Sequence, residues 1–224
     1  MNENTRRRAC AAALVVAPAL SLAGHLVQLT PTAHDTSSEL ASLAAAPGRA
    51  ELSAGIGFLA LLLAVPAFVG MAGPLWASRP RLALVGVSMS VAGVLGLTAL
   101  MGSSPLMVAL ARSTGDHGVL VEIADAYESS ALVTVWVLLM LVGYSLGPIV
   151  LGVGLWRSGW PWLVPAALVL GVALMTADAG RWPLAAAFAA TWLGLATAGV
   201  RLWNEAGERD PAGAADERVD AFTD

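Results

Sequence analysis

The sequence has few charged side chains and no lysine. Charged residues make up 12% of its 224 positions and hydrophobic residues 57%, whereas soluble domains carry about 25% charged residues. A chain with this balance could not cover a water-exposed surface, but it suits a protein whose solvent is lipid. The twelve basic residues, all arginine, do not gather into a patch typical of nucleic-acid binding. The lipid bilayer is therefore the predicted partner, and nucleic acid is not.

The sequence also lacks the motifs of well-known catalytic sites. Its one cysteine, Cys10, excludes an internal disulfide and a metal site built from several cysteines. A Walker loop, a G-x-S-x-G elbow, an H-E-x-x-H pair and a C-x-x-C pair are all absent. The loops predicted on the inner side are too short to hold a soluble catalytic domain. We therefore predict no enzymatic activity and no cofactor.

What the sequence does contain is a series of long apolar runs. A membrane-spanning helix needs about 20 mostly apolar residues, and continuous rather than alternating hydrophobicity favours helices over a barrel. The predicted fold is an all-α membrane protein: a six-transmembrane-helix bundle with short amphipathic extracytoplasmic helices. The predicted spans are Ala9–Leu29, Leu52–Ala72, Leu82–Ser103, Ala131–Trp156, Trp162–Ala179 and Pro183–Leu202.

The arginines predict how these spans thread through the membrane. With the N-terminus inside, nine arginines fall on the cytoplasmic side and three, namely Arg49, Arg112 and Arg181, on the outer side. This bias predicts a multi-pass protein with both termini in the cytoplasm. The use of arginine without lysine is typical of a GC-rich bacterial genome, so the predicted membrane is a bacterial plasma membrane. One alternative stays open, because Arg6–Arg8, an apolar run and Ser21–Ala23 together resemble a cleavable signal peptide. Cleavage would leave five spans and an external N-terminus.

Two outer loops, residues 31–51 and 104–130, are predicted to form a small cap over the bundle. Thr36 and Glu39 have the spacing of a capping box, and the residues behind them that share one face are Leu40, Leu43 and Ala44. The second loop predicts an amphipathic helix. Its apolar stripe is Val119, Leu120, Ile123, Ala124 and Tyr127, and its acidic face is Glu122, Asp125 and Glu128. Residues 204–224 are acidic and lack an apolar period, which predicts a disordered cytoplasmic tail.

Polar residues inside the spans are few, and two groups are candidates for a site. His25 and Gln28, three residues apart in the outer half of the first span, share a helix face. We expect this pair to hydrogen-bond a neighbouring helix, or else to line a cavity or a proton path. The mid-span polar residues are otherwise hydroxyls, and the absence of a buried charge argues against proton coupling.

The fourth span carries the second group, Gly143, Tyr144, Ser145, Gly147 and Pro148. Two glycines four residues apart permit close helix packing, and a proline inside a helix removes a backbone donor and kinks it. We expect either a packing seam or a mid-membrane cavity at this point. The glycines predicted to form the partner face, all in the third span, are Gly86, Gly93 and Gly96.

Histidine and aspartate open both outer loops in mirrored order, as His34-Asp35 and Asp116-His117. Imidazole and carboxylate ligands together could bind zinc or another divalent cation. Ligands from two loops have no diagnostic spacing, however, and Asp35 and Asp116 are equally well explained as helix N-caps. The sequence therefore predicts no metal site, with these four residues as the candidates if one exists.

Three short segments resemble a known group of proteins. They are Pro47–Leu52 before the second span, Arg79–Ala83 after it, and Leu155–Gly159 after the fourth span. Across most of Arg8–Trp203 the chain resembles actinobacterial six-helix integral membrane proteins of unknown function. The resemblance implies a topology, and it implies no catalytic residues.

Function is predicted only by class. The first hypothesis is a non-enzymatic accessory, sensor or interaction protein that associates with another membrane protein or with a second copy of itself. The second is a transporter or channel for a small or lipid-like molecule, using the predicted kink in the fourth span. The third is a metal-dependent membrane enzyme on the outer face, using the histidines and aspartates of the loops.

Overall fold

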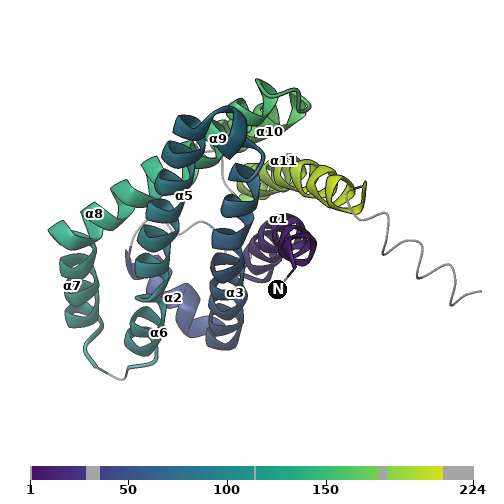
Figure 1. Cartoon of the computed structure of the whole chain (residues 1–224). Helices are drawn as coiled ribbons and strands as arrows, with labels where there is room; N and C mark the ends of the chain where they lie inside the picture. Colours follow the sequence, from purple (N-terminus) through teal and green to yellow (C-terminus); the bar gives the residue numbers. More distant parts are fainter. Residues whose placement is uncertain (1, 29–35, 114, 177–180, 209–224) are drawn as a thin grey trace, which may run out of the picture.

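The computed structural model describes residues 2–28, 36–113, 115–176 and 181–208, and in these residues it contains helices and no strands (Figure 1). The helices run in chain order as α1 (Glu3–Gln28), α2 (Thr36–Ala45), α3 (Pro47–Ala72), α4 (Leu75–Ser78), α5 (Pro80–Met101), α6 (Ser104–Ala111), α7 (His117–Glu128), α8 (Ala131–Leu139), the π-helix η1 (Met140–Leu146), α9 (Gly147–Trp156), α10 (Leu163–Thr176) and α11 (Arg181–Glu208).

Five stretches of the described helices are long and apolar enough to cross a membrane. They are Glu3–Val27, Pro47–Ala72, Pro80–Ala111, Ala131–Trp156 and Leu184–Glu208. The all-α class is confirmed, and these helices indicate a multi-pass membrane protein. Helix α10 is apolar but has only 14 residues, so it extends about 21 Å at 1.5 Å per residue. That is less than the hydrocarbon thickness of about 30 Å.

Two boundaries differ from the sequence prediction for clear physical reasons. Helix α3 begins at Pro47 rather than Leu52, because a proline in the first turn has no hydrogen bond to lose. The tail predicted to be disordered from residue 204 is instead helical through Glu208. In this last part of α11, Arg201 Nε donates to Glu205 Oε1 over 3.1 Å, and Ala206 is buried. The prediction of disorder was therefore wrong for residues 204–208. Residues 209–224 lie outside the described part.

The core of the bundle is built from helices that are distant in sequence. Helix α1 packs along α3 and α11, and α10 packs along α11. The largest fully buried side chains are Phe68, Leu14, Met71, Leu75, Leu151, Leu155 and Val164. Many of the large apolar side chains on α3 and α8 are exposed instead. Such an arrangement suits helices whose outer surface contacts lipid.

Glycines allow α5 and η1 to pack backbone against backbone. A Cβ placed on Gly143 would lie 2.5 Å from the backbone nitrogen of Gly93, and one on Gly93 would collide with the Tyr144 backbone. On either side of this contact, a Cβ on Gly86 would collide with the Leu151 side chain, and a Cβ on Gly96 would lie 2.7 Å from the Trp136 carbonyl oxygen. We call this contact between α5 and α8–η1–α9 the glycine seam. It joins the faces that the sequence suggested as partners.

Span four changes its helical form where Pro148 approaches. The proline ring would clash with the carbonyl four residues earlier, that of Tyr144, and it offers no N–H. The backbone widens to a π-helix over Met140–Leu146 before α-helix resumes at Gly147, whose N–H bonds to the Gly143 carbonyl. The predicted irregularity is therefore a π-helical stretch. Such stretches frequently mark functional sites.

The outer loops fold into a cap with a small core of its own. Helices α2, α6 and α7 gather at one end of the bundle, at the lower left of Figure 1. Their buried cluster consists of Leu40, Leu43, Met107, Val108 and Ala124. The Thr36 hydroxyl bonds the Asp125 carboxylate across α2 and α7. Both predicted loops thus contain helices, α2 in the first and α6 and α7 in the second.

The predicted apolar stripe of the second loop is only partly buried. Val119 is 52% exposed and Ile123 is 47% exposed, whereas Ala124 is fully buried. The reason is that the small Ala124 side chain lets α7 approach α2 closely, which turns the face with Val119 and Ile123 outward. Ala44, predicted to face inward from α2, is exposed as well.

We predict that Gly143→Ala strongly destabilises the fold, while Gly55→Ala does not. At Gly143 the added methyl group meets backbone atoms of α5, which cannot move without separating the helices, and overpacking of this kind costs about 1–3 kcal/mol. At Gly55, on α3, nothing lies within 4 Å, so alanine gains helix propensity of up to about 1 kcal/mol. Thermal unfolding of both purified variants checks this. Equal melting temperatures would contradict the glycine seam.

A second prediction concerns the pH dependence of the cap. Burial, and then the carboxylates of Glu39 and Asp125, raise the pKa of Glu128 above its usual 4.5. An acid whose pKa is raised by folding is favoured in its protonated form, so the cap loses stability as the pH rises through 4.5 and above. Glu128→Gln removes this loss. Amide hydrogen exchange of α2 and α7, corrected for intrinsic rates, will show slower exchange in the variant near pH 7.

The matched control for this measurement is Glu122→Gln, an exposed position on the same helix. It leaves the pH dependence unchanged. If Glu128→Gln speeds exchange of α7 at pH 7, then the charge at Glu128 stabilises the cap and the sign of the effect is the opposite of ours.

Candidate functional site

A cavity of about 400 Å³ lies among the membrane-spanning helices. Side chains from α1, α3, α5, η1, α10 and α11 line it, so each of the six predicted spans contributes to its wall. Its volume falls in the lower part of the range of about 300–1,000 Å³ that is typical of small-molecule sites. The lining residues are Ser21, Gly24, His25, Ser53, Gly57, Leu61, Leu97, Met101, Met140, Leu141, Tyr144, Ser145, Val172, Met175, Leu184 and Phe188. We call it the central cavity.

His25 lines this cavity and carries an unsatisfied polar atom. Its Nε2 is buried and has no hydrogen-bond partner among the described residues. The imidazole lies against the Phe188 ring of α11, with ring centroids 5.2 Å apart and the planes tilted by 35°. Gly24, the preceding residue, lets α1 approach α3 closely, since a Cβ there would lie 3.3 Å from the Ser53 carbonyl.

The π-helical stretch of span four brings two more polar side chains to the same wall. Tyr144 and Ser145 are adjacent in sequence, and both line the central cavity. The Tyr144 ring packs edge-on against Phe68, with centroids 6.1 Å apart, and its side chain interacts with Ser21 of α1. Ser21 and Ser53 are tied to backbone carbonyls of α1, at Ala17 over 3.2 Å and at Gly24 over 2.9 Å. The polar groups of the wall therefore come from α1, α3 and η1.

Among the residues that the structure describes, the lining of the central cavity contains no Asp, Glu, Lys or Arg. A charged molecule would enter it without a counter-charge, and in a low-dielectric environment that is strongly unfavourable. An uncharged molecule with a mostly apolar surface meets no such penalty. The chemistry of the lining therefore suits binding of a neutral, largely apolar molecule rather than proton or ion transfer.

Two smaller spaces adjoin the central cavity. A space of about 290 Å³ beneath the cap shares Ser53 and Met101 with it, and it also reaches Glu39 and Glu128. The Met101 methyl group occupies the space beside Gly57 that a larger side chain would fill. Deeper in the bundle, a space of about 20 Å³ shares Tyr144 and Ser145 with the central cavity and reaches Pro148. Ser53 and Met101 thus separate the central cavity from the space under the cap.

The residues singled out in the sequence fall into three groups. His25, Tyr144 and Ser145 come together around the central cavity, while Gly143 and Gly147 lie in the glycine seam and pack against α5. Pro148 lines only the small inner space. Gln28 is the last residue of α1, and its side chain is not among the described ones.

The structure does not bring the proposed metal ligands together in the part that it describes. Asp116 is the N-cap of α7, where its Oδ1 accepts from the Gly118 N–H over 2.8 Å. His117 begins α7, and His34 and Asp35 lie outside the described residues. No group of three or more His, Cys, Asp or Glu side chains in the described ranges is arranged to hold a metal ion.

Sequence reasoning missed several residues of the cavity wall, chiefly Ser21, Ser53, Met101 and Phe188. Ser21 was considered only as part of a cleavage signal, and Ser53 stands near the start of a span, where serine is common. Only for Ser21 was there a usable signal, because it lies four residues before His25 and so shares its helix face. Phe188 and Met101 reach the cavity from distant spans, and no local pattern marks them.

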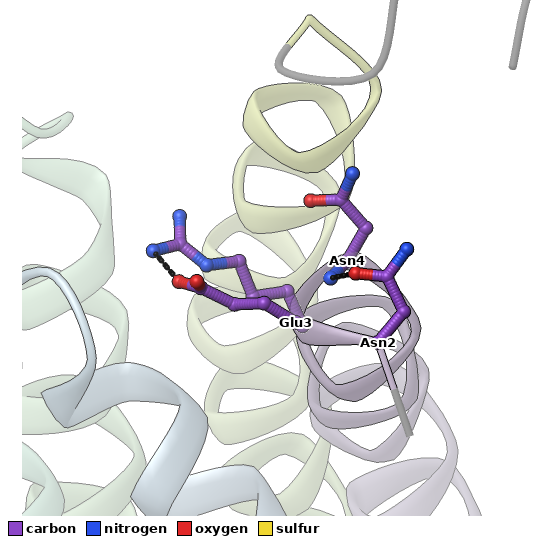
Figure 2. A network of polar contacts seen from close by, with 4 residues as sticks. Asn2, Glu3 and Asn4 are labelled. Carbon is purple, nitrogen blue, oxygen red and sulfur yellow. Dashed lines mark hydrogen bonds and ion pairs between the residues drawn. The ribbon is translucent and has the colours of Figure 1, made fainter. Parts of the chain in front are cut away.

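Two other surface hollows were weaker candidates. The larger of the two, about 650 Å³, lies between α3 and α5–α6. It is lined in part by Arg112 and Glu51, which form an ion pair with 2.8 Å between Nη2 and Oε1. Another, about 520 Å³, lies at the N-terminal end of α1. Figure 2 shows the polar contacts of Asn2, Glu3 and Asn4 at this end of the helix. The charges of this hollow are largely paired, since Arg7 bonds Glu3 over 2.8 Å and Arg201 bonds Glu205. Neither is lined by residues of all six predicted spans, as the central cavity is.

Comparison with protein-family models, with curated proteins and with solved structures finds no match to this chain. The central cavity therefore has to be interpreted from its own chemistry.

Proposed function

We propose that this chain is a non-enzymatic membrane protein that binds a small, uncharged, mostly apolar molecule in the central cavity, as a sensor or accessory protein. The observation that carries the proposal is the position of the cavity. It lies between helices from every predicted span and has an apolar wall with a few polar groups. A molecule bound there contacts each span at once, so its binding changes how the spans pack. A partner membrane protein, or a second copy of this chain, could bind differently to the changed arrangement.

The topology that we propose is six spans with both termini in the cytoplasm of a bacterium. Two contacts support an arginine-rich inner end: Arg79 donates to the Arg157 carbonyl over 3.2 Å, and Arg201 to the Gly159 carbonyl over 3.2 Å. The cap lies at the other end of α3. Retention of the first span is supported by Leu14, which is fully buried in the core, so cleavage after Ala23 would expose part of that core.

A transporter of a small or lipid-like molecule is the second candidate. The observation that favours it is the space beneath the cap, which meets the central cavity at Ser53 and Met101 and could serve as an outer path. The Arg-rich end offers no matching path among the described residues, so we place binding before transport. The metal-dependent enzyme receives no support, because Asp116 already serves as a helix cap.

The binding proposal predicts that Val172→Phe abolishes ligand stabilisation while Val169→Phe does not. Val172 lines the central cavity, and phenylalanine there fills it. Val169, on the same helix, is 49% exposed on the outer surface. In nanodiscs, 1-decanol will raise the melting temperatures of wild type and of Val169→Phe by a few degrees relative to the same proteins without decanol. The reason is that a ligand that binds only the folded state stabilises it.

Val172→Phe will show no such shift, although its own melting temperature stays close to that of wild type. An equal shift in all three proteins would mean that decanol acts through the lipid, and it would overturn the binding proposal.

Single cysteines test the topology. In a Cys10→Ala background, an impermeant maleimide added to intact cells will label Ser113→Cys, at the exposed end of α6, but will not label Asn204→Cys, exposed on α11. Permeabilised cells will label both. Labelling of Asn204→Cys in intact cells would place the C-terminus outside and exclude the six-span topology proposed here.

A further inference from the structure

Three arginines gather at the turn between α9 and α10. Arg157 belongs to this turn, which covers residues 157–160. Arg79 Nη2 donates to the Arg157 carbonyl oxygen over 3.2 Å, and Arg201 Nη1 donates to the Gly159 carbonyl oxygen over 3.2 Å. Since Arg79 precedes α5 and Arg201 belongs to α11, the fold brings together side chains that are distant in sequence. We call these three residues and the turn the arginine turn.

Two similar segments of the sequence form this end of the molecule. Leu75–Arg79 reads Leu-Trp-Ala-Ser-Arg, and Leu155–Ser158 reads Leu-Trp-Arg-Ser. The leucine that begins each segment is fully buried. The two serines meet, because Ser78 Oγ and Ser158 Oγ lie 3.3 Å apart. This contact holds the two arginine-bearing segments side by side.

The arginine turn carries more positive charge than the described residues neutralise. Among the described carboxylates, only Glu205 pairs with one of the three arginines, namely Arg201, over 3.1 Å. Three positive charges and one negative charge leave a net charge of +2, and the C-terminal end of α9 offsets about half a charge. Each bond to a backbone carbonyl uses one of the five N–H donors of a guanidinium group. Donors and charge therefore remain for a further anion.

Tryptophans around the arginine turn indicate that it lies at the depth of the lipid headgroups. Trp156, just before the turn, is 51% exposed, and Trp162, just after it, is 68% exposed. Exposed indole rings of this kind are enriched at the membrane–water interface. Trp160 is buried instead, and the Arg201 guanidinium carbon lies 4.9 Å from its ring centroid, which helps to fix this arginine. The anionic groups available at this depth are lipid phosphates.

We propose that Arg79 and Arg157 bind the phosphate group of an anionic phospholipid at the arginine turn. A guanidinium group presents parallel N–H donors that match two phosphate oxygens. A phospholipid whose headgroup also carries an ammonium group has no net charge, so a positively charged site favours one without it. Phosphatidylglycerol is the simplest such lipid. The lipid belongs to the inner leaflet in the topology proposed above, but its binding is independent of the central cavity.

The test measures binding of fluorescent phosphatidylglycerol and phosphatidylcholine to the full chain in neutral detergent micelles. Wild type will bind phosphatidylglycerol about tenfold more tightly, the ratio expected for one hydrogen bond between charged partners. Arg157→Gln and Arg79→Gln will each lose most of this preference. Because the Arg157 side chain is exposed, Arg157→Gln will keep the wild-type melting temperature in the absence of lipid, so its loss of binding does not come from unfolding.

The matched control is Arg81→Gln, in the first turn of α5. Arg81 is exposed at the same end of the molecule and carries the same charge, but it forms no bond to the arginine turn within the described structure. This variant will keep most of the preference. If it loses as much as Arg157→Gln does, the charge of the whole end attracts the lipid without a site, and the proposal is wrong.

Inorganic phosphate distinguishes a lipid ligand from a soluble one. At constant ionic strength it will not displace phosphatidylglycerol from wild type, because it has no acyl chains to contact the helices below the turn. Displacement would show that the arginine turn binds a soluble anion, which refutes the lipid. If wild type binds both lipids equally, other anions, such as the carboxylates of residues 209–224, already neutralise the turn and the proposal fails. The decanol test of the central cavity is unaffected by either result.

Discussion

The contact between α5 and η1 determines much of the remaining structure. Two helix backbones touch there because Gly93 and Gly143 face each other and neither has a side chain. In a bilayer, the hydrophobic effect does not drive helices together, so close van der Waals packing of this kind has to hold the bundle. Ser90, fully buried in the same contact beneath Gly147, shows how little space remains.

The glycine seam also explains why a cavity exists beside it. Where α5 and span four touch closely, the backbone of span four is π-helical, which accommodates the proline at its end. Tyr144, in that π-helical stretch, contacts Ser21 of α1 and Phe68 of α3, and both Tyr144 and Ser145 line the central cavity. The central cavity is the space between those side chains and the more distant helices, so close packing on one side of span four is paired with open space on the other.

The wall of that space contains few polar groups, and most of them are satisfied. Ser21 and Ser53 donate to backbone carbonyls of α1, which keeps their hydroxyl groups compatible with an apolar environment. His25 differs because its Nε2 remains without a partner in the described structure. The cap has the opposite character, with like charges on α2 and α7 close enough to raise the pKa of Glu128. The apolar interior and the acidic cap thus meet at Ser53 and Met101.

The sequence by itself determined the all-α class, the apolar spans, the helices of the cap and the glycines that bring α5 and span four together. These features follow from local patterns: runs of apolar residues, capping spacing and glycines at helical intervals. It did not determine that α11 extends to Glu208, because that depends on burial of Ala206 against other helices. Nor did it determine which way α7 faces.

The tertiary structure alone decided that His25, Tyr144 and Ser145 share one cavity with Phe188 and Met101. These residues come from α1, η1, α11 and α5, and no spacing along the chain encodes their distance in space. Local pattern shows that a polar side chain in a span needs a partner, since lipid offers none. Only the packing of all the helices shows whether a protein atom fills that need, and for His25 Nε2 none of the described ones does.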